Sequence, residues 1–302
     1  FYSRVADNNS AIPQDRAYFN YKYLNDVPVF KDAGANAPDQ DRDLYYYEIG
    51  LEKTFLEGNL SAELIIPFAH MPESQIVGPA AGASPSHVEL LDIAFGLKAL
   101  LVETDTTAVS AGFRVEAPTK ENVQILGVSS YPNDVWKVTP YLAVLMTPSD
   151  DVFFQAFAAY RMQTDDSARV LQGVTTNVIR KPNYLELDAQ LGKWLYRNHG
   201  GEGLTGLQAK IELHYTGTFE PGDPRLVSAG SLRLYGGEHD YLNLTTGLTA
   251  LINDNATVTG AFVLPLREGS DESIPNAATR AFPSDRLFDW EFVAQFNYYF
   301  GN

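Results

Sequence analysis

The chain has 302 residues, no cysteine and a formal net charge of −16 at pH 7. The acidic balance argues against a nucleic-acid-binding protein, which needs a basic surface. Without cysteine the chain has no disulfide, no thiol nucleophile and no cysteine-based metal site. No run of about eighteen apolar residues predicts a membrane-spanning helix, and the 17 tyrosines and 17 phenylalanines favour strands.

The start of the chain is polar and has no regular period. Residues 1–15 are therefore expected to form an irregular lead-in to a single domain over residues 16–302. Because the chain starts at Phe1 and shows no basic and apolar leader, we expect it to be a processed or partial chain, from which export cannot be tested directly.

Segments with strand character then recur to the end of the chain, in most of which apolar and polar residues alternate, as in strands with one apolar face. We expect twelve strands. They are Arg16–Leu24, Leu44–Phe55, Asn59–Pro67, Val88–Val102, Ala108–Glu116, Val135–Met146, Val152–Met162, Tyr184–Tyr196, Leu204–Thr216, Tyr241–Ile252, Thr257–Leu266 and Asp289–Phe300.

The last of these strands shows the pattern most clearly. Trp290, Phe292, Ala294, Phe296 and Tyr298 occupy one face, and the other face is mostly polar. Aromatic residues stand at both ends of the apolar face, as expected where a lipid-facing strand crosses two interfaces. At about a dozen residues the strand is also long enough to span a bilayer when it is tilted.

Connections between the expected strands alternate in length. Five are short and rich in turn residues: 57–58, 103–107, 147–151, 197–203 and 253–256. The others are long, which places all short turns at one rim of a closed sheet and all long loops at the other. A further candidate, Leu226–Tyr235, would break this order, so we expect it to be an excursion within a long loop.

These features predict an all-β fold: a transmembrane antiparallel up-and-down β-barrel of about 12 strands with short periplasmic turns and long extracellular loops. The expected location is the bacterial outer membrane, with the lipid bilayer and small solutes as partners. Whether the barrel is a monomer or a trimer is left open.

Three stretches also resemble porin-like outer-membrane proteins of planctomycete-type bacteria, distant relatives of the barrel family assigned to phenol degradation. They are Ile12–Arg16 with Tyr18–Tyr21, Lys193–Asn198 and Leu287–Glu291. The resemblance implies a barrel and a role in transport. It does not name a substrate.

Alternation also predicts which side chains line the interior, because charged groups facing lipid would be costly. Lys210, Glu212 and His214 share one face of their strand, opposite Ile211 and Leu213. The residues predicted to line a pore are Glu48, Glu63, Asp92, Lys98, Arg114, Glu116, Lys137, Arg161, Glu186, Asp188, Lys210, Glu212, His214, Glu291 and Gln295. The same alternation also places Arg16, Asn20, Lys22, Glu52, Gln155, Gln190, Asn243, Asp289 and Asn297 inside.

Acidic and basic residues are nearly balanced in this lining, and most of the surplus acid lies in long loops. Asp26, Asp32, Asp39, Asp41 and Asp43 are expected in one loop, and Glu268, Asp271, Glu272 and Asp285 in another. A balanced lining fits a water-filled pore, and it equally fits a narrow lumen closed by ion pairs.

No catalytic residue, metal site or cofactor is predicted. Glu212 and His214 lie two residues apart on one strand face and in principle suit acid–base or metal chemistry. One histidine beside one glutamate is more often an ordinary part of a polar lumen.

The sequence therefore predicts a non-enzymatic, porin-like channel for passive diffusion of small solutes. Two alternatives remain: a substrate-specific uptake barrel for hydrophobic compounds, and a closed structural or adhesive barrel with acidic surface loops. A soluble secreted β-protein is disfavoured because its loops would not be sorted by length.

Overall fold

The computed structural model describes residues 2–30, 40–71, 87–119, 123–125, 129–131, 135–164, 167–172, 175–180, 182–198, 200–220, 225–226, 233–234, 238, 240–267 and 286–300. The helical structure among them is a single 3₁₀ turn, η1 (Leu56–Gly58). None of the described helices is long and apolar enough to cross a membrane.

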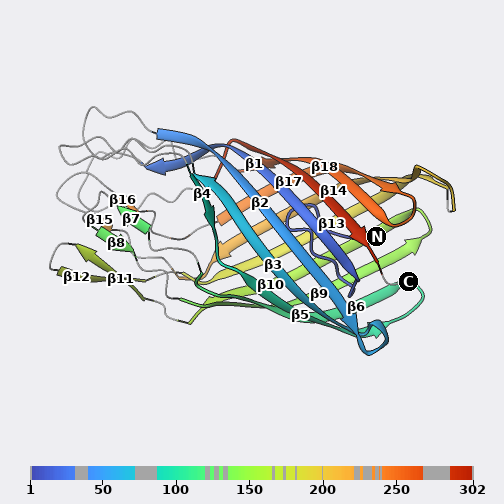
Figure 1. Ribbon diagram of the computed structural model, residues 1–302, viewed down its shortest axis with the longest axis horizontal. Helices are drawn as coiled ribbons and strands as arrows, with labels where there is room; N and C mark the ends of the chain where they lie inside the picture. The colour runs from blue at the N-terminus through green and yellow to red at the C-terminus, as the bar shows by residue number, and fades with distance from the viewer. Residues whose placement is uncertain are drawn as a thin grey trace.

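Long antiparallel strands make up the wall of the molecule (Figure 1). In chain order they are β1 (Arg16–Phe30), β2 (Gln40–Phe55), β3 (Leu60–Met71), β4 (His87–Leu90), β5 (Ala94–Glu103), β6 (Thr107–Glu116), β9 (Lys137–Ser149), β10 (Val152–Gln163), β13 (Tyr184–Arg197), β14 (Leu204–Thr218), β17 (Asp240–Ile252), β18 (Ala256–Pro265) and β19 (Trp290–Tyr299).

The sheet closes on itself because the first and last strands pair. β1 and β19 run antiparallel from Arg16 opposite Tyr299 to Asn25 opposite Trp290, and β1 also pairs with β2. From β19 each wall strand pairs with the one before it in the chain, back to β3, and β3 pairs with β2. β4 and β5 both pair with β3 and share one place in the wall, so the barrel has twelve strands as predicted.

The prediction of one continuous strand over Val88–Val102 is wrong in one respect. The structure divides it into β4 and β5 at Leu91, Asp92 and Ile93. There the Thr119 side chain takes the place of a strand neighbour, because its hydroxyl accepts from the Ile93 N–H and donates to the Leu91 carbonyl. Several other strands extend beyond their predicted ends at the rim.

The two rims of the barrel differ. The turns β2–β3, β5–β6, β9–β10, β13–β14 and β17–β18 are short and lie at one end, called here the turn end, where the chain termini also lie (Figure 1). The opposite end, the loop end, carries two small sheets. One comprises β7 (Val123–Ile125), β8 (Ser129–Tyr131), β11 (Ser167–Gln172) and β12 (Thr175–Arg180).

The second small sheet is the hairpin β15 (Arg225–Leu226) and β16 (Arg233–Leu234), which pairs with itself and not with the wall. The interpretation of Leu226–Tyr235 as an excursion within a loop is thereby confirmed. The acidic loop residues Asp32, Asp39, Glu268, Asp271, Glu272 and Asp285 lie outside the described residues, and so does the side chain of Asp41.

Side chains alternate across the wall as the period of two requires. On β19 Phe296 is 45% exposed, whereas its neighbour Gln295 is 2% exposed. Outward-facing aromatic rings meet across strands near the loop end, with Tyr23 lying 5.2 Å from Trp290 and 5.3 Å from Tyr45 between ring centroids. Such a band of aromatic rings marks the level of a membrane interface.

Candidate functional site

The inner wall near the loop end carries paired charges from neighbouring strands. Lys137 lies 2.9 Å from both Asp92 and Glu116, and Arg161 lies 3.0 Å from Glu186. Two looser pairs join Arg114 to Glu63 at 3.8 Å and Lys22 to Glu291 at 3.6 Å. Most of these side chains are partly exposed, whereas Asp92 and Glu291 are buried. We call this part of the inner wall the vestibule.

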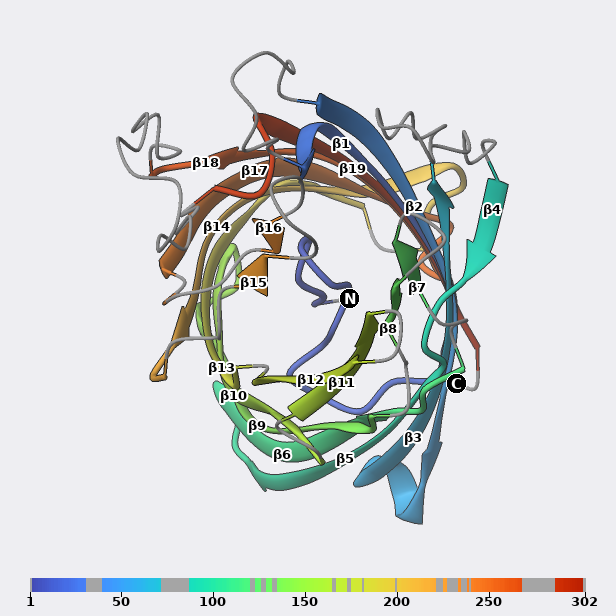
Figure 2. The same cartoon turned by 90° about the vertical axis from the view of Figure 1, so that its left-hand side faces the viewer.

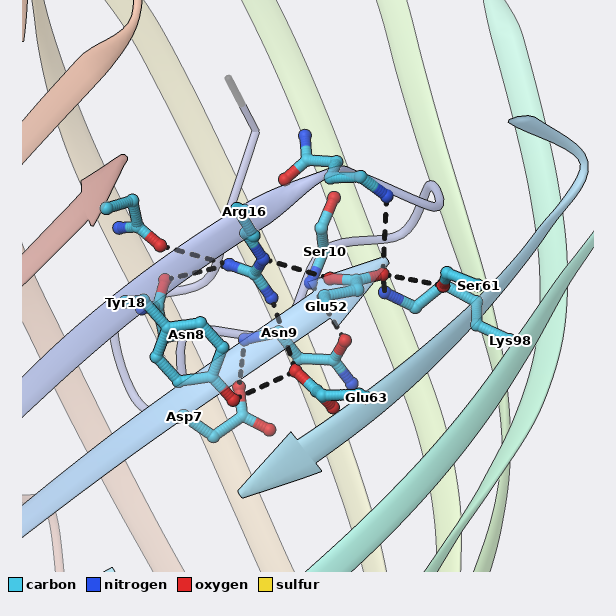
Figure 3. A network of polar contacts seen from close by, with 12 residues as sticks. Asp7, Asn8, Asn9, Ser10, Arg16, Tyr18, Glu52, Ser61, Glu63 and Lys98 are labelled. Carbon is cyan, nitrogen blue, oxygen red and sulfur yellow. Dashed lines mark hydrogen bonds and ion pairs between the residues drawn. The ribbon is translucent and has the colours of Figure 1, made fainter. Parts of the chain in front are cut away.

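A more deeply buried network lies toward the turn end (Figure 3). Glu52 accepts from Arg16 at 2.9 Å, Lys98 at 3.0 Å and Ser61 at 2.7 Å. Each of these four side chains is nearly inaccessible to solvent. A buried carboxylate with two cations and a hydroxyl is fully paired, as a charge in a low-dielectric interior must be.

The lumen also contains the start of the chain. Residues 2–15, called here the N-terminal segment, run inside the ring of strands (Figure 2). At the turn end Asp15 fixes the segment by accepting from the Thr54 N–H at 2.5 Å and the Lys53 ammonium at 2.6 Å. Residues 2–15 contain turns and no strand or helix, and no pattern in the sequence indicates that they lie inside the barrel.

Wall side chains bind the main chain of the N-terminal segment. Glu212 accepts from the N–H of Val5 at 2.6 Å and of Ala6 at 3.2 Å. Gln190 and Lys210 donate to the Ser3 carbonyl at 3.2 Å and 3.0 Å. All three wall residues are buried.

Further along the segment the same kind of contact recurs. Ala11 donates its N–H to Gln155 and accepts at its carbonyl from Ser110, at 3.3 Å and 2.6 Å. The N–H of Gln14 reaches Glu52 at 3.3 Å. The segment is thus held at several heights of the lumen.

Charged and amide side chains of the segment add to these contacts. Arg4 bonds to Asp188 on the wall and to Asp7 within the segment, and its guanidinium lies 4.0 Å from the centroid of the Phe157 ring. Burial alone would raise the pKa of Asp7, but the guanidiniums of Arg4 and Arg114 and the Asn9 N–H hold it well below its usual range.

Apolar residues of the segment pack into two places on the wall. Val5 is fully buried in a cluster with Ala261, Val263 and Val293. Ala11, with Tyr2 and Ile12 beside it, packs in a second cluster. Its wall members are Ala108, Ala143, Leu145, Phe153, Phe157, Trp194 and Leu251.

Segment and inward side chains together fill the cross-section of the barrel. Each of the twelve wall positions offers at least one inward residue at most 3% exposed. Taken strand by strand, these are Asn20, Glu52, Ser61, Lys98, Ser110, Ala143, Gln155, Gln190, Glu212, Thr245, Thr259 and Gln295. Solvent does not reach this belt of the described inner wall from either end.

The predicted lining residues fall into two groups in this arrangement. Glu63, Asp92, Arg114, Glu116, Lys137, Arg161, Glu186 and Glu291 form the ion pairs of the vestibule. Lys98, Asp188, Lys210, Glu212 and Gln295 belong to the belt or contact the N-terminal segment. His214 contacts Asp188 and Glu212, and Glu48 bonds to Asn20 and Tyr46. That any of them lines a conducting path stays a prediction.

His214 and Glu212 belong to the anchoring of the segment. His214 lies 2.7 Å from Asp188 and 3.1 Å from Glu212, both of which also bind the segment. Among the described residues no group of three or more histidine and acidic side chains has the geometry of a metal site. His214, Glu212 and Asp188 thus form a cluster that binds the N-terminal segment.

The functional residues that the sequence reasoning did not reach are those of the segment itself. Ser3, Val5, Ala6 and Ala11 act through main-chain groups, which leave no trace in a side-chain pattern. One signal was available: uncharged amides at inward positions, such as Gln155 and Gln190, need partners once buried.

Residues 36–230 match the profile of the family described as "Putative MetA-pathway of phenol degradation". The chain belongs to this family. The predicted resemblance to the phenol-degradation barrels is thereby confirmed. A search of the curated proteins finds no match.

Solved structures with the same fold are bacterial outer-membrane proteins. The COG4313 outer membrane channel from Pseudomonas putida F1 is 12% identical at a TM-score of 0.59, with 98% of each chain covered. The β-domain of the Bordetella autotransporter BrkA is 12% identical at a TM-score of 0.52, covering 95% of this chain and 100% of that one. Both likenesses show the fold, an antiparallel β-barrel that an outer membrane channel also has.

Proposed function

We propose that this barrel is an outer-membrane channel for small solutes that the N-terminal segment closes at rest. The observation that carries the proposal is the belt of inward residues that solvent barely reaches, which runs around the whole circumference and several of whose members bind the segment. Displacing residues 2–14 would remove the filling and open a passage bordered by polar side chains.

The contacts that hold the segment support a reversible closure. They are hydrogen bonds, the ion pair of Arg4 with Asp188 and two small apolar clusters. Apart from the main chain that continues into β1, no covalent bond ties residues 2–14 to the wall. Buried polar groups on the wall, such as Glu212 and Lys210, can be solvated by water when the segment leaves. An aliphatic wall would gain nothing from water.

Once open, the passage would select weakly by charge. Cations and anions alternate around the vestibule in close pairs, for example Lys137 with Glu116 and Arg161 with Glu186. A solute crossing this region meets transverse fields of both signs and not a field of one sign. We therefore propose passive diffusion of small solutes and not ion-specific transport.

Single-channel recording of the wild-type barrel and of Arg4→Ala tests this proposal. The substitution removes both ion pairs of Arg4, so we expect the open probability to rise several-fold at unchanged unit conductance. Arg161→Ala is the matched control, because it removes one arginine from the vestibule and leaves the segment untouched. Equal gating in all three proteins would show that the segment is not the gate.

A second candidate function is uptake of hydrophobic compounds, and one observation favours it. Phe153, Phe157, Trp194 and Leu251 form an inward apolar patch near the turn end, now covered by Ala11 and its neighbours. The description of the family concerns phenol degradation. An aromatic solute such as phenol would suit this patch better than the charged vestibule.

The two candidates separate in liposomes that contain the Arg4→Ala protein. Swelling in small neutral sugars, at a rate unaffected by Phe153→Ser, supports passive diffusion. Phenol entry that exceeds sugar entry and falls on Phe153→Ser supports hydrophobic uptake. A protein that passes neither solute and carries no current is the closed structural barrel.

A further inference from the structure

The wall recognises the N-terminal segment as a peptide. Four buried side chains, on three strands, direct their polar atoms at main-chain groups of Ser3, Val5 and Ala6. Gln190 comes from β13, Lys210 and Glu212 from β14, and Gln295 from β19; Gln190 also donates to Glu212 and orients it.

The order of these groups matches the order of main-chain groups in a peptide. The Ser3 carbonyl meets two donors, Gln190 and Lys210. Next, the N–H groups of Val5 and Ala6 meet one acceptor, Glu212, and the Val5 carbonyl meets the donor Gln295. Residues 5–7 form a turn, which the Arg4 N–H closes by donating to the Asn9 carbonyl at 2.7 Å, so the wall binds a folded peptide. Main-chain bonds supply affinity in such a site, and side-chain pockets supply specificity.

Two side-chain sites accompany the main-chain contacts. Asp188 and the face of the Phe157 ring receive the guanidinium of Arg4, and Ala261, Val263 and Val293 surround Val5. A basic residue followed by a small branched aliphatic residue therefore satisfies both sites. The first site is anionic and aromatic, and the second is apolar and small.

Glu212, Lys210, Gln190 and Gln295 are each at most 4% exposed while the segment is in place, and its departure removes these partners. Anything that takes its place must pair them again. A ligand with alternating amide N–H and carbonyl groups restores every bond. A hydrocarbon or a simple aromatic compound restores none and would leave the buried charges unpaired.

We propose that the lumen of this barrel is a binding site for short peptides carrying a basic residue followed by a branched aliphatic residue. The N-terminal segment occupies this site in cis and competes with peptide in trans. The inference rests on the proposed displacement of the segment and names the ligand class that would achieve it.

The experiment uses the full chain with its own segment weakened. Arg4→Ala combined with Val5→Asp leaves the wall unchanged, removes the ion pairs and places a charge in the apolar pocket. Folding is checked by the shift of the band on heating before electrophoresis. If the double variant does not fold, Arg4→Ala alone serves, at higher peptide concentration, because the tethered segment competes at an effective concentration of roughly millimolar.

The probe is dye-labelled acetyl-Ser-Arg-Val-Ala-amide, and fluorescence anisotropy in detergent reports binding without requiring conduction. The decisive control peptide carries N-methyl groups on its valine and alanine, which removes both N–H donors to Glu212 and retains every side chain. We expect the N-methylated peptide to bind roughly ten- to a hundredfold more weakly.

Glu212→Gln in the same background completes the test. It should lower the affinity for the unmodified peptide roughly tenfold and leave the affinity for the N-methylated peptide unchanged. The reason is that both changes remove the same interaction, the bonds between Glu212 and the two peptide N–H groups. Equal binding of the two peptides, or no saturable binding by a folded variant, overturns the peptide site. Saturable binding by a barrel that never conducts supports the site and refutes the channel, so the two failures are distinguishable.

Discussion

Arg16 has no exposed surface, yet it carries a full charge in the interior of a membrane barrel. Glu52 at 2.9 Å balances that charge, and Asn8 of the N-terminal segment and Asn297 of β19 each accept from the guanidinium at 3.2 Å. One side chain thus ties the segment, the first strands and the last strand together. Removing one partner of such a buried ion pair lowers the stability more than replacing both partners by apolar residues, because it leaves one buried charge without compensation.

Arg16→Met should therefore lower the free energy of unfolding by about 3 kcal/mol, because it leaves Glu52 with less compensation. The midpoint of urea unfolding in detergent measures the effect. The control is Lys53→Met, which breaks the Lys53–Asp15 pair at the rim, where the lysine is 51% exposed. That loss should stay below about 1 kcal/mol, and equal losses would contradict the buried network.

Asp7 provides a prediction about pH. Its folded pKa lies below the ordinary value of about 3.9, because Arg4, Arg114 and the Asn9 N–H stabilise the carboxylate against the cost of burial. A depressed folded pKa gives stabilisation that is present above the unfolded pKa and is lost as pH falls through the folded value.

Acid should therefore loosen the segment only below about pH 4. Channel opening measured from pH 7 to pH 3 should rise at the acid end in the wild type. Asp7→Asn should be more open at neutral pH and show a smaller acid response. An acid response of the same size in both proteins would assign it to other carboxyl groups.

At the scale of the strands, close packing inside the barrel depends on paired small and large residues. Gly50 on β2 lies opposite Tyr18 on β1, and a Cβ at Gly50 would stand 1.9 Å from the Tyr18 ring. The tyrosine hydroxyl donates to Glu63 on β3 at 2.9 Å. The Tyr18 ring lies over Gly50 of β2 so that its hydroxyl reaches Glu63 on β3, and only a residue without a side chain leaves room for the ring.

Gly50→Ala should cost about 1–3 kcal/mol, because the ring must move and its bond to Glu63 is lost. Gly260→Ala is the matched control, because a Cβ there meets nothing within 4 Å and the residue faces outward. Unfolding midpoints of the two variants give the comparison. A loss at Gly260 as large as the loss at Gly50 would point to strand flexibility and not to the contact with Tyr18.

For the whole molecule, the period of two and the sorting of turns by length were sufficient to predict a closed twelve-strand barrel. Strands such as β14 and β19 carry the signal in every residue, because lipid on one side and a polar interior on the other constrain each position. Paired charges such as Lys137 with Glu116 follow from the same alternation.

The filling of the lumen could not be predicted in this way. The bond from Val5 to Glu212 joins residues 207 positions apart and uses a main-chain donor, which every residue except proline possesses. The break at Leu91–Ile93 likewise depends on Thr119, a loop side chain outside the strand pattern. The alternation of apolar and polar residues predicts the strands of the wall, but it carries no information about the segment inside them.

The central claim is that residues 2–15 fill the lumen of the folded barrel, and thiol labelling tests it directly. The chain has no cysteine, so Ala11→Cys places a single thiol where the native residue has no exposed surface. The measurement is the rate of modification by a bulky, membrane-impermeant maleimide in the folded protein, relative to Lys53→Cys at the exposed rim. We expect the Ala11→Cys thiol to react at least about a hundredfold more slowly than Lys53→Cys and to match it after unfolding, since access requires displacement of the segment. Equal rates in the folded protein would contradict the account and place the segment outside the lumen.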